Sequence, residues 1–132
     1  MSEIYKNRHA AFNLHVHLVF ITKQRKKVLG ELHHDYFSEC ASEVCGIFDA
    51  ELTECSGKAD YVHMLIQYPP TVQLSKLVNN LKSVTSRRMR GEFVDLTEAY
   101  DEPVLWSRSY FASSCGGASL DIIEQYIQNQ KS

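Results

Sequence analysis

The C-terminal part of the chain carries two side chains that could act together on a phosphodiester. Tyr126 and Gln130 are four residues apart, so they share one face of a helix expected over residues 120–130. Such a pair is more often an ordinary part of an amphipathic surface. A tyrosine nucleophile needs help, because its phenol is protonated at neutral pH. A divalent cation on the phosphate would provide that help, so a nearby metal site would favour a catalytic interpretation.

Two predicted strands carry candidate metal ligands. His15 and His17 are separated by one residue and point to the same face of a strand, and Tyr61 and His63 have the same relation. Two imidazoles side by side on one strand are a good start for a metal site. Histidines on the polar face of a sheet are common, however, so neither pair is decisive alone.

Alternating and helical patterns predict the elements that position these residues. Residues 12–21 and 61–67 each alternate between an apolar face and a second face, which is typical of half-buried strands. Shorter strands are expected at 51–55 and 109–113, with turns at 56–58 and 115–117. The order of elements predicts an α+β fold of the split β-α-β (ferredoxin-like) class, with an antiparallel four-stranded sheet, two helices on one face and a C-terminal helix carrying the tyrosine. The other sheet face is then free to carry a site.

Apolar stripes define the predicted helices. The stripe of helix 31–48 consists of Leu32, Tyr36, Phe37, Cys40, Val44 and Phe48, and that of helix 72–90 consists of Leu74, Leu77, Val78, Leu81 and Val84. The last helix would pack through Leu120, Ile123 and Ile127, and Ser119 can cap its N-terminus. Trp106 is expected to pack in the core or at an interface.

Length and composition predict one globular domain over residues 1–132, with a core of about 12–130. The chain is 44% hydrophobic and 23% charged, which argues against disorder. No apolar run approaches the length of a membrane span, and the first residues lack the apolar core of a signal peptide, so we expect a cytoplasmic protein without a membrane partner. The four cysteines form no CxxC pair and are expected to be buried apolar groups.

Charge is segregated along the chain, although the net charge is only −2. Residues 1–30 hold six bases and one acid, residues 31–60 hold eight acids and one base, and residues 71–91 hold five bases and no acid. This arrangement can present one basic face, and the basic stripe of helix 72–90 suits a phosphate backbone. The acidic face of helix 31–48 would repel nucleic acid, so the helix layer is expected to lie away from DNA.

Five segments in order resemble the small single-tyrosine (TnpA-like) transposases of the HUH superfamily, from the insertion-sequence two-hundred and six-hundred-and-five group. They are LHVHLVFITKQRKKV, DYVHMLIQYPP, LSKLVNNLKSVTSRRMR, LWSRSYFASSCGG and IIEQYIQNQ, and the resemblance runs from about residue 12 to 130. The resemblance implies a dimer that cuts and rejoins single-stranded DNA at hairpin-marked element ends through a 5′-phosphotyrosine. It also implies Mg²⁺ or Mn²⁺ as cofactor, and a tyrosine helix that completes the site of the partner subunit.

Carried over to this chain, the resemblance makes Tyr126 the nucleophile and His63 and Gln130 metal ligands. One position departs from the family pattern. The family has Asp-His-hydrophobe-His where this chain has Asp60-Tyr61-Val62-His63, so the first metal-binding histidine is replaced by Tyr61. A neutral phenol is a poor Mg²⁺ ligand compared with imidazole.

Three interpretations of Tyr61 remain open. In the first, metal binding is weakened and activity is lost. In the second, Asp60, Tyr61 itself or water fills the position of the missing metal ligand. In the third, the histidines of the first strand replace that ligand. The third is disfavoured, because His15-Val16-His17 aligns with a strand outside the family's metal site. Neighbouring strands of this fold could nevertheless bring His17 close to His63.

The main functional hypothesis is a metal-assisted transposase that acts on single-stranded DNA through Tyr126. The alternative is a dimer that binds DNA hairpins but is catalytically impaired by Tyr61. An RNA-binding module of the same fold ranks last, because the sheet lacks paired stacking aromatics. Candidate phosphate contacts are Lys23, Arg25, Lys26, Lys27, Lys76, Lys82, Arg87 and Arg90, and candidate stacking residues are Tyr68, Phe93 and Tyr110.

Overall fold

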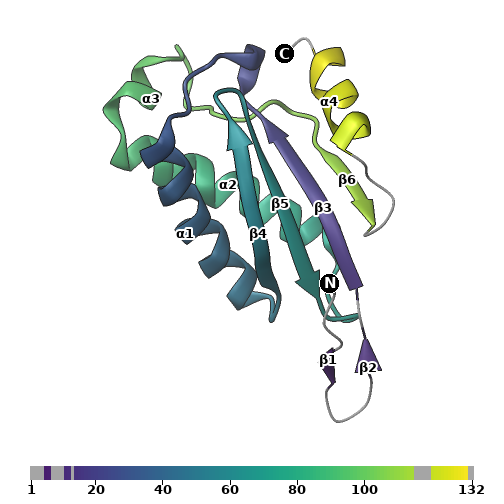
Figure 1. Cartoon of the computed structure of the whole chain (residues 1–132). Coiled ribbons are helices and arrows are strands. Elements are labelled where there is room, and N and C mark those ends of the chain that lie inside the picture. The colour runs from purple at the N-terminus through teal and green to yellow at the C-terminus, as the bar shows by residue number, and fades with distance from the viewer. Residues whose placement is uncertain (1–4, 7–10, 13, 115–119, 131–132) are drawn as a thin grey trace.

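A four-stranded antiparallel sheet organises the chain, as predicted. The computed structural model describes residues 5–6, 11–12, 14–114 and 120–130. The strand order is β4 (Glu51–Lys58), β5 (Tyr61–Tyr68), β3 (Leu14–Ile21) and β6 (Phe111–Ser114), and every neighbouring pair is antiparallel. The helices are α1 (Glu31–Ile47), α2 (Leu74–Glu92), the short α3 (Val94–Glu98) and α4 (Leu120–Asn129), and a 3-10 turn, η1, covers Lys23–Arg25 (Figure 1). Two short strands, β1 (Tyr5–Lys6) and β2 (Ala11–Phe12), pair with each other apart from this sheet.

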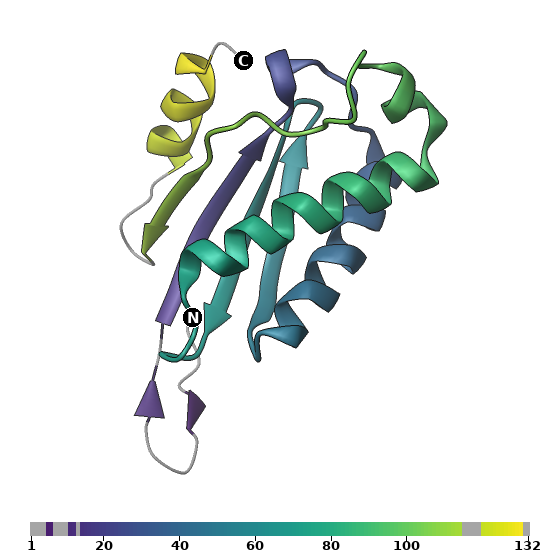
Figure 2. The ribbon, with the colours of Figure 1, turned by 180° about the vertical axis from the view of Figure 1, so that it is seen from behind.

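The main core lies between the sheet and the pair of long helices. The alternation of β3 and β5 puts Leu18, Phe20 and Met64 on the face that α1 and α2 cover, and all three are fully buried. Figure 2 shows α2 crossing this face of the sheet with α1 beside it. Trp106 joins this core as predicted, and its indole N–H donates to Thr85 Oγ1 at 3.0 Å.

A second, smaller apolar cluster lies on the opposite sheet face. Val19 and Ile21 of β3 pack there against Ile123 and Ile127 of α4, and all four side chains are buried. The predicted packing stripe of the last helix is thereby confirmed for its two described residues. The consequence for function is that α4 sits on the face that α1 and α2 leave open.

The structure corrects two local predictions. Leu32 is 72% exposed, because helix α1 turns Phe37, Ala41 and Val44 toward the sheet instead. The expected turn at 56–58 is wrong, since these residues continue β4 and the chain reverses at residues 59–60. The expected strand at 109–113 is β6, which begins at Phe111. The expected turn at 115–117 and the Ser119 cap lie outside the described residues.

Gly57 explains why a turn-like sequence forms a strand. A Cβ at this position would lie 2.2 Å from the backbone oxygen of Tyr61 and 2.5 Å from His34 Cε1, so only glycine lets the strand pass His34. We expect Gly57→Ala to destabilise the fold by about 2–3 kcal/mol, because backbone atoms must move. Gly46→Ala is the matched control, since nothing lies within 4 Å of its added Cβ and the helical alanine should gain up to about 1 kcal/mol. Urea unfolding measures both, and equal stability of the two variants would contradict this account.

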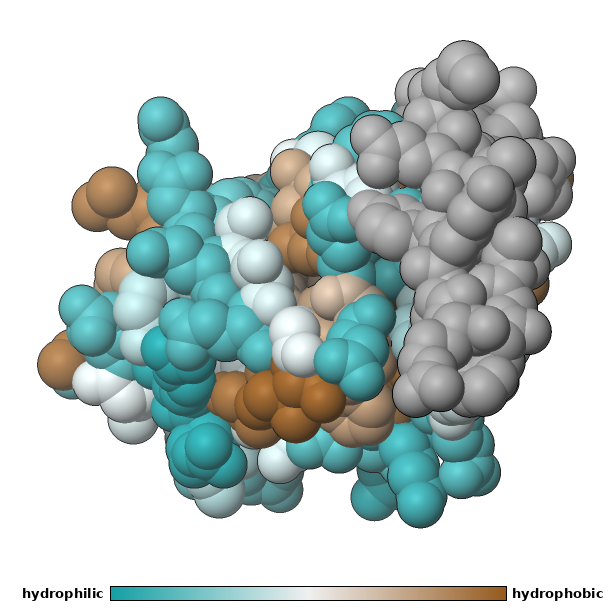
Figure 3. Space-filling view, turned by 90° about the horizontal axis from the view of Figure 1, so that it is seen from below, coloured by the Kyte–Doolittle hydropathy of each residue, from teal (hydrophilic) through white to brown (hydrophobic). Residues whose placement is uncertain are grey.

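The described surface and thiols are unremarkable for a globular protein. Cys40, Cys45 and Cys55 are free, and burial raises the pKa of Cys45 to about 12, so its thiol stays protonated. The face seen from below is largely hydrophilic where described residues form it, with small apolar areas (Figure 3). None of the helices in the described part of the chain has the length and apolarity that a membrane crossing needs.

Candidate active site

Two histidines from neighbouring strands face each other on the open face of the sheet. His17 Nδ1 lies 3.0 Å from His63 Nε2, and the two ring planes are 9° from parallel with centroids 5.2 Å apart. The strand register produces this pair, because Val19 lies opposite His63 and Leu65 lies opposite His17, so the two histidines are diagonal neighbours. The expectation that the fold could bring His17 close to His63 is confirmed.

Electrostatics keep His63 uncharged near neutral pH. Burial lowers the pKa of His63 below its ordinary value, and the nearby His17 lowers it further, whereas Glu54 partly opposes the shift. A neutral imidazole has a ring nitrogen with a free lone pair, and this is the form that binds metals. The pair can share one N–H···N hydrogen bond, in which one ring donates and the other accepts.

Tyr61 lies under α4 and not in a polar cavity. It is half-buried and packs against the apolar cluster of Val19, Ile21, Ile123 and Ile127. Burial raises the pKa of the Tyr61 phenol, and the carboxylates of Glu124 and Asp60 raise it further, so the hydroxyl stays protonated. The Tyr61 side chain therefore serves in packing.

Asp60 is engaged at the turn between β4 and β5. It is 8% exposed, and Arg25 Nε lies 3.4 Å from its Oδ2. Arg25 also donates from Nη1 to the backbone oxygen of Gln128 at 3.5 Å, so this guanidinium connects the turn with the C-terminal end of α4. A cation near the last carbonyls of a helix is favourable.

Tyr126 of α4 and Gln130, which follows the last residue of this helix, lie together, as their spacing predicts. Tyr126 Oη donates to Ser109 Oγ at 3.1 Å, and Ser109 Oγ donates to Gln130 Oε1 at 2.8 Å. The Tyr126 ring also packs against Phe111, with centroids 5.3 Å apart. Ser109 precedes β6 and thus holds both predicted functional side chains of α4 in one hydrogen-bonded chain.

The packing of α4 places this chain of hydrogen bonds on the same sheet face as the histidine pair. Val19, which lies directly opposite His63 in the sheet, belongs to the same apolar cluster as Ile123 and Ile127. Tyr126 packs at the edge of this cluster. The phenol and the histidine pair therefore occupy one face of the sheet within a single chain.

The donor atoms of this face suit a divalent cation only in part. Imidazole at His63 and carboxamide at Gln130 are competent ligands, whereas the protonated Tyr61 phenol is a poor one. Within the described ranges, no three His, Cys, Asp or Glu side chains converge on one point. The 3.0 Å separation of His17 Nδ1 and His63 Nε2 is the observation that fits a metal, because both rings can turn to direct their lone pairs at one cation beside the line that joins these nitrogens.

Comparison with known proteins decides the family. The pattern described as "Transposase IS200 like" matches residues 10–130, which is nearly the whole chain. The chain belongs to the IS200-like transposase family. Two curated transposases are similar over most of their length. The transposase for insertion sequence element IS200 of Salmonella typhimurium is 26% identical over 122 residues, covering 92% of this chain and 80% of that protein.

Further relatives agree with this assignment. The ISDra2 transposase TnpA of Deinococcus radiodurans is 26% identical over 128 residues, covering 97% of this chain and 91% of that one. The crystal structure of a candidate transposase from Deinococcus radiodurans R1 superposes with a TM-score of 0.85 at 29% identity, covering 97% and 98% of the two chains. A REP-associated tyrosine transposase bound to a REP hairpin shares the fold, with a TM-score of 0.56 at 12% identity over 96% of this chain and 68% of that one.

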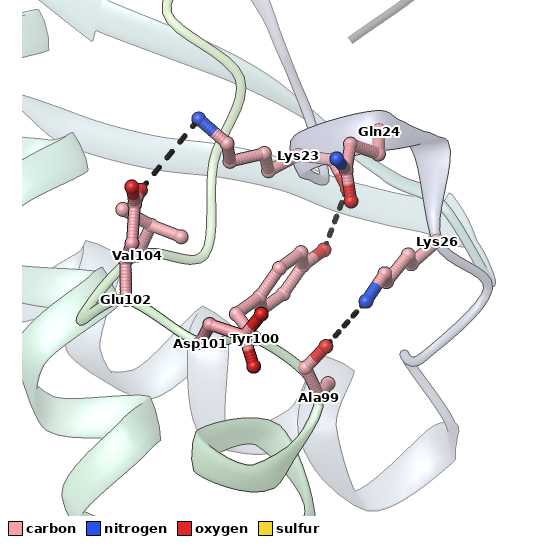
Figure 4. A pocket seen from close by; sticks show the side chains of 8 residues that line it. All are labelled: Lys23, Gln24, Lys26, Ala99, Tyr100, Asp101, Glu102 and Val104. Atoms are coloured by element: carbon pink, nitrogen blue, oxygen red, sulfur yellow. Dashed lines mark hydrogen bonds and ion pairs between the residues drawn. The ribbon is translucent and has the colours of Figure 1, made fainter.

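Two of the predicted phosphate contacts of this transposase, Lys23 and Lys26, line a cavity of about 200 Å³ (Figure 4). Lys26 Nζ donates to the backbone oxygen of Ala99 and lies 4.7 Å from the centroid of the Tyr100 ring. Lys23 Nζ lies 4.0 Å from Glu102 Oε2, and Tyr100 donates to the Lys23 carbonyl. Lys27 is exposed. Bound DNA would therefore have to replace weak surface contacts of this loop.

The predicted contacts on α2 lie on the helix layer, across the sheet from the histidine pair. Lys76 and Arg87 are exposed, and Arg90 Nε donates to Ser86 Oγ. Lys82 donates to the backbone oxygens of Ser107 and Arg108 at 2.7 and 2.8 Å, and burial lowers its pKa. Lys82 thus holds the segment that leads to Ser109.

Of the predicted stacking residues, Tyr110 is the most exposed at 38%, Tyr68 packs against the main core, and Phe93 packs edge-on against His33 with centroids 4.5 Å apart.

Ser109 was missed by sequence reasoning. An isolated serine carries no signal of its own, and only its position before β6 brings it under Tyr126 and Gln130. The available hint was its place as the first residue of the strand predicted over 109–113.

Proposed function

We propose that this protein cleaves and rejoins single-stranded DNA beside hairpins by transesterification through Tyr126. The observation that carries the proposal is the hydrogen-bonded chain from Tyr126 through Ser109 to Gln130 on the sheet face that holds His63. Membership of the IS200-like transposases supports the reaction class, and the relative that is bound to a REP hairpin supports a hairpin as the DNA feature.

The reaction exchanges one phosphodiester bond for another. Tyr126 Oη would attack phosphorus, a Tyr–O–P bond would form, and the P–O3′ bond would break. The phenol loses one proton and the 3′-oxygen gains one, so atoms and charge balance. The new bond keeps the free energy of the old one, which lets the reverse reaction rejoin DNA without ATP.

Ser109 and Gln130 position the nucleophile. Because Tyr126 donates its proton to Ser109, the lone pairs of its oxygen point away from Ser109 and are available for attack. The Ser109 hydroxyl is oriented in turn by Gln130 Oε1. Fixing the hydroxyl in this way reduces the number of unproductive orientations.

A divalent cation, Mg²⁺ or Mn²⁺, would be held by His63 and Gln130, and when bound it polarises the phosphoryl oxygens and neutralises developing charge. In this chain, Gln130 Oε1 already accepts from Ser109 and keeps a second lone pair for a ligand. Asp60 and Tyr61 stay predicted ligands, but each has other contacts, with Arg25 and with the apolar cluster.

Ser109→Ala tests the positioning role. It removes one neutral hydrogen bond to the nucleophile, worth about 0.5–1.5 kcal/mol, so the initial rate of covalent adduct formation should fall about 2–10-fold. Ser109→Thr keeps a hydroxyl and should restore most of the rate, which a purely structural loss would not allow. An unchanged rate in Ser109→Ala would remove Ser109 from the mechanism.

The proposed function is tested with a hairpin oligonucleotide that has single-stranded flanks, incubated with the protein and Mn²⁺. We expect a protein–DNA band that resists SDS, and mass spectrometry should place the nucleotide on the peptide that contains Tyr126. An adduct on any other residue, or a hairpin that is neither bound nor cut, would contradict the proposal.

The alternative is a dimer that binds hairpins but is catalytically impaired, and the packing of Tyr61 in the apolar cluster favours it. In that case the protein binds the hairpin without forming the band, and Tyr61→His gains it. Gain of the band by Tyr61→His alone would establish the alternative.

We further propose a homodimer in which α4 acts in trans, as the resemblance implies. Within one chain α4 packs on its own sheet, so the same surface could receive the partner's helix in an exchanged arrangement. Mixing inactive Tyr126→Phe with inactive His63→Ala tests this. Adduct on the His63→Ala chain in the mixture indicates trans action, and its absence indicates that each chain uses its own helix.

A further inference from the structure

We infer that His17 and His63 together form the metal-binding pair of this site, with His17 supplying the imidazole that Tyr61 no longer supplies. The inference rests on the proposed function for the role of the metal, but the binding itself is a property of the protein without DNA. It differs from the family pattern, in which both imidazoles come from one strand, because here they come from β3 and β5.

The separation of the two ring nitrogens is the first argument. His17 Nδ1 and His63 Nε2 are 3.0 Å apart. Two metal–nitrogen bonds of about 2.0–2.1 Å at angles between octahedral and tetrahedral values place their nitrogens roughly 2.9–3.4 Å apart. The ring planes are 9° from parallel and the centroids are 5.2 Å apart, so the two rings lie nearly end to end with their facing nitrogens directed at each other. To hold one cation, the pair therefore needs a change of tautomer and a turn of both rings that directs their lone pairs to a point beside this line.

The support of the two rings is the second argument. Both histidines are on the two central strands, which pair over residues 14–21 and 61–68, so their backbones are fixed by the sheet ladder. The His63 side chain is half-buried. Ligands on rigid elements bind with less loss of conformational freedom than ligands on loops.

The state of the competing ligands is the third argument. The Tyr61 ring is packed against Ile21, Ile123 and Ile127, and moving it toward a cation would expose this cluster. Asp60 is paired with Arg25. His17 is the described nitrogen ligand in contact with His63, and Gln130 and water or a phosphate oxygen can complete the coordination shell.

The donor set also predicts which cations bind. Imidazole nitrogens favour later first-row ions, whereas Mg²⁺ prefers oxygen ligands. We therefore expect Co²⁺ to bind at least tenfold more tightly than Mg²⁺. Isothermal titration of the whole protein, without DNA, measures both affinities, and Mg²⁺ binding as tight as Co²⁺ binding would count against an imidazole pair.

The decisive experiment counts nitrogen ligands. Substoichiometric Cu²⁺ serves as the probe, and electron paramagnetic resonance resolves the splitting from each bound nitrogen. We expect two nitrogens in the parent and one in His17→Phe, which keeps the ring volume, and in His17→Ala as a second variant. Adding Tyr61→His to His17→Phe should restore two. Co²⁺ affinity should fall at least about tenfold in His17→Phe.

Two controls separate ligation from structural effects. Tyr61→Phe removes the phenol hydroxyl, and His34→Gln removes an imidazole that bonds the Lys58 carbonyl on the other sheet face; both should keep two nitrogens. Three results would overturn the inference: one bound nitrogen in the parent, two bound nitrogens in His17→Phe, or loss of a bound nitrogen in Tyr61→Phe. A two-nitrogen spectrum in a protein that forms no DNA adduct would reject the proposed function and leave the metal pair standing.

Discussion

Replacing Tyr126 by phenylalanine is expected to abolish the covalent protein–DNA adduct. The variant keeps the ring that packs against Phe111 and loses only the oxygen that would bond to phosphorus. Removal of a nucleophile lowers the rate of such reactions by roughly 10³-fold or more, so the SDS-resistant band should fall below detection. Hairpin binding, measured by gel shift, should stay within about twofold of the parent.

Tyr61→Phe is the matched control for this experiment. Tyr61 lies in the same apolar cluster as Tyr126 and also carries a phenol, but its hydroxyl is not the proposed nucleophile. The control should keep the adduct in any parent that forms it. An adduct that survives in Tyr126→Phe and disappears in Tyr61→Phe would move the nucleophile from α4 to β5.

Replacing Phe37 by alanine is expected to cost about 3–5 kcal/mol of unfolding free energy. Phe37 is fully buried, and its ring meets the Trp106 ring at a centroid distance of 5.6 Å and an interplanar angle of 79°. The substitution removes this edge contact and leaves a cavity between α1 and the sheet. Since a domain of this size has about 5–15 kcal/mol of stability, the urea midpoint should fall by a large fraction of its value.

Leu32→Ala provides the control on the same helix. Leu32 is 72% exposed, so its truncation should change stability by no more than about 0.5 kcal/mol. The apolar stripe read from the sequence includes both Leu32 and Phe37, and by itself it predicts a large loss of stability for both substitutions. A large loss for Leu32→Ala would show that its side chain is covered in solution, for example by a second copy of the chain.

The architecture could be predicted because each element carries its own periodic signal. Alternation in β3 and β5 indicates which side chains face the helices, and the burial of Leu18, Phe20 and Met64 follows from it. The order of the elements then leaves few arrangements for the sheet. Local exceptions were not predictable, because the strand through Gly57 depends on the closeness of His34 and not on the turn propensity of its neighbours.

The sequence by itself determined the side chains that share a face: Tyr126 with Gln130 on one helix, and Tyr61 with His63 on one strand. These relations are set by the repeat of a single element. Only the tertiary structure decided that His17 faces His63 and that Ser109 lies between Tyr126 and Gln130. Such contacts depend on strand register and on where α4 packs, and both are set by apolar burial summed over many residues, which no local pattern encodes.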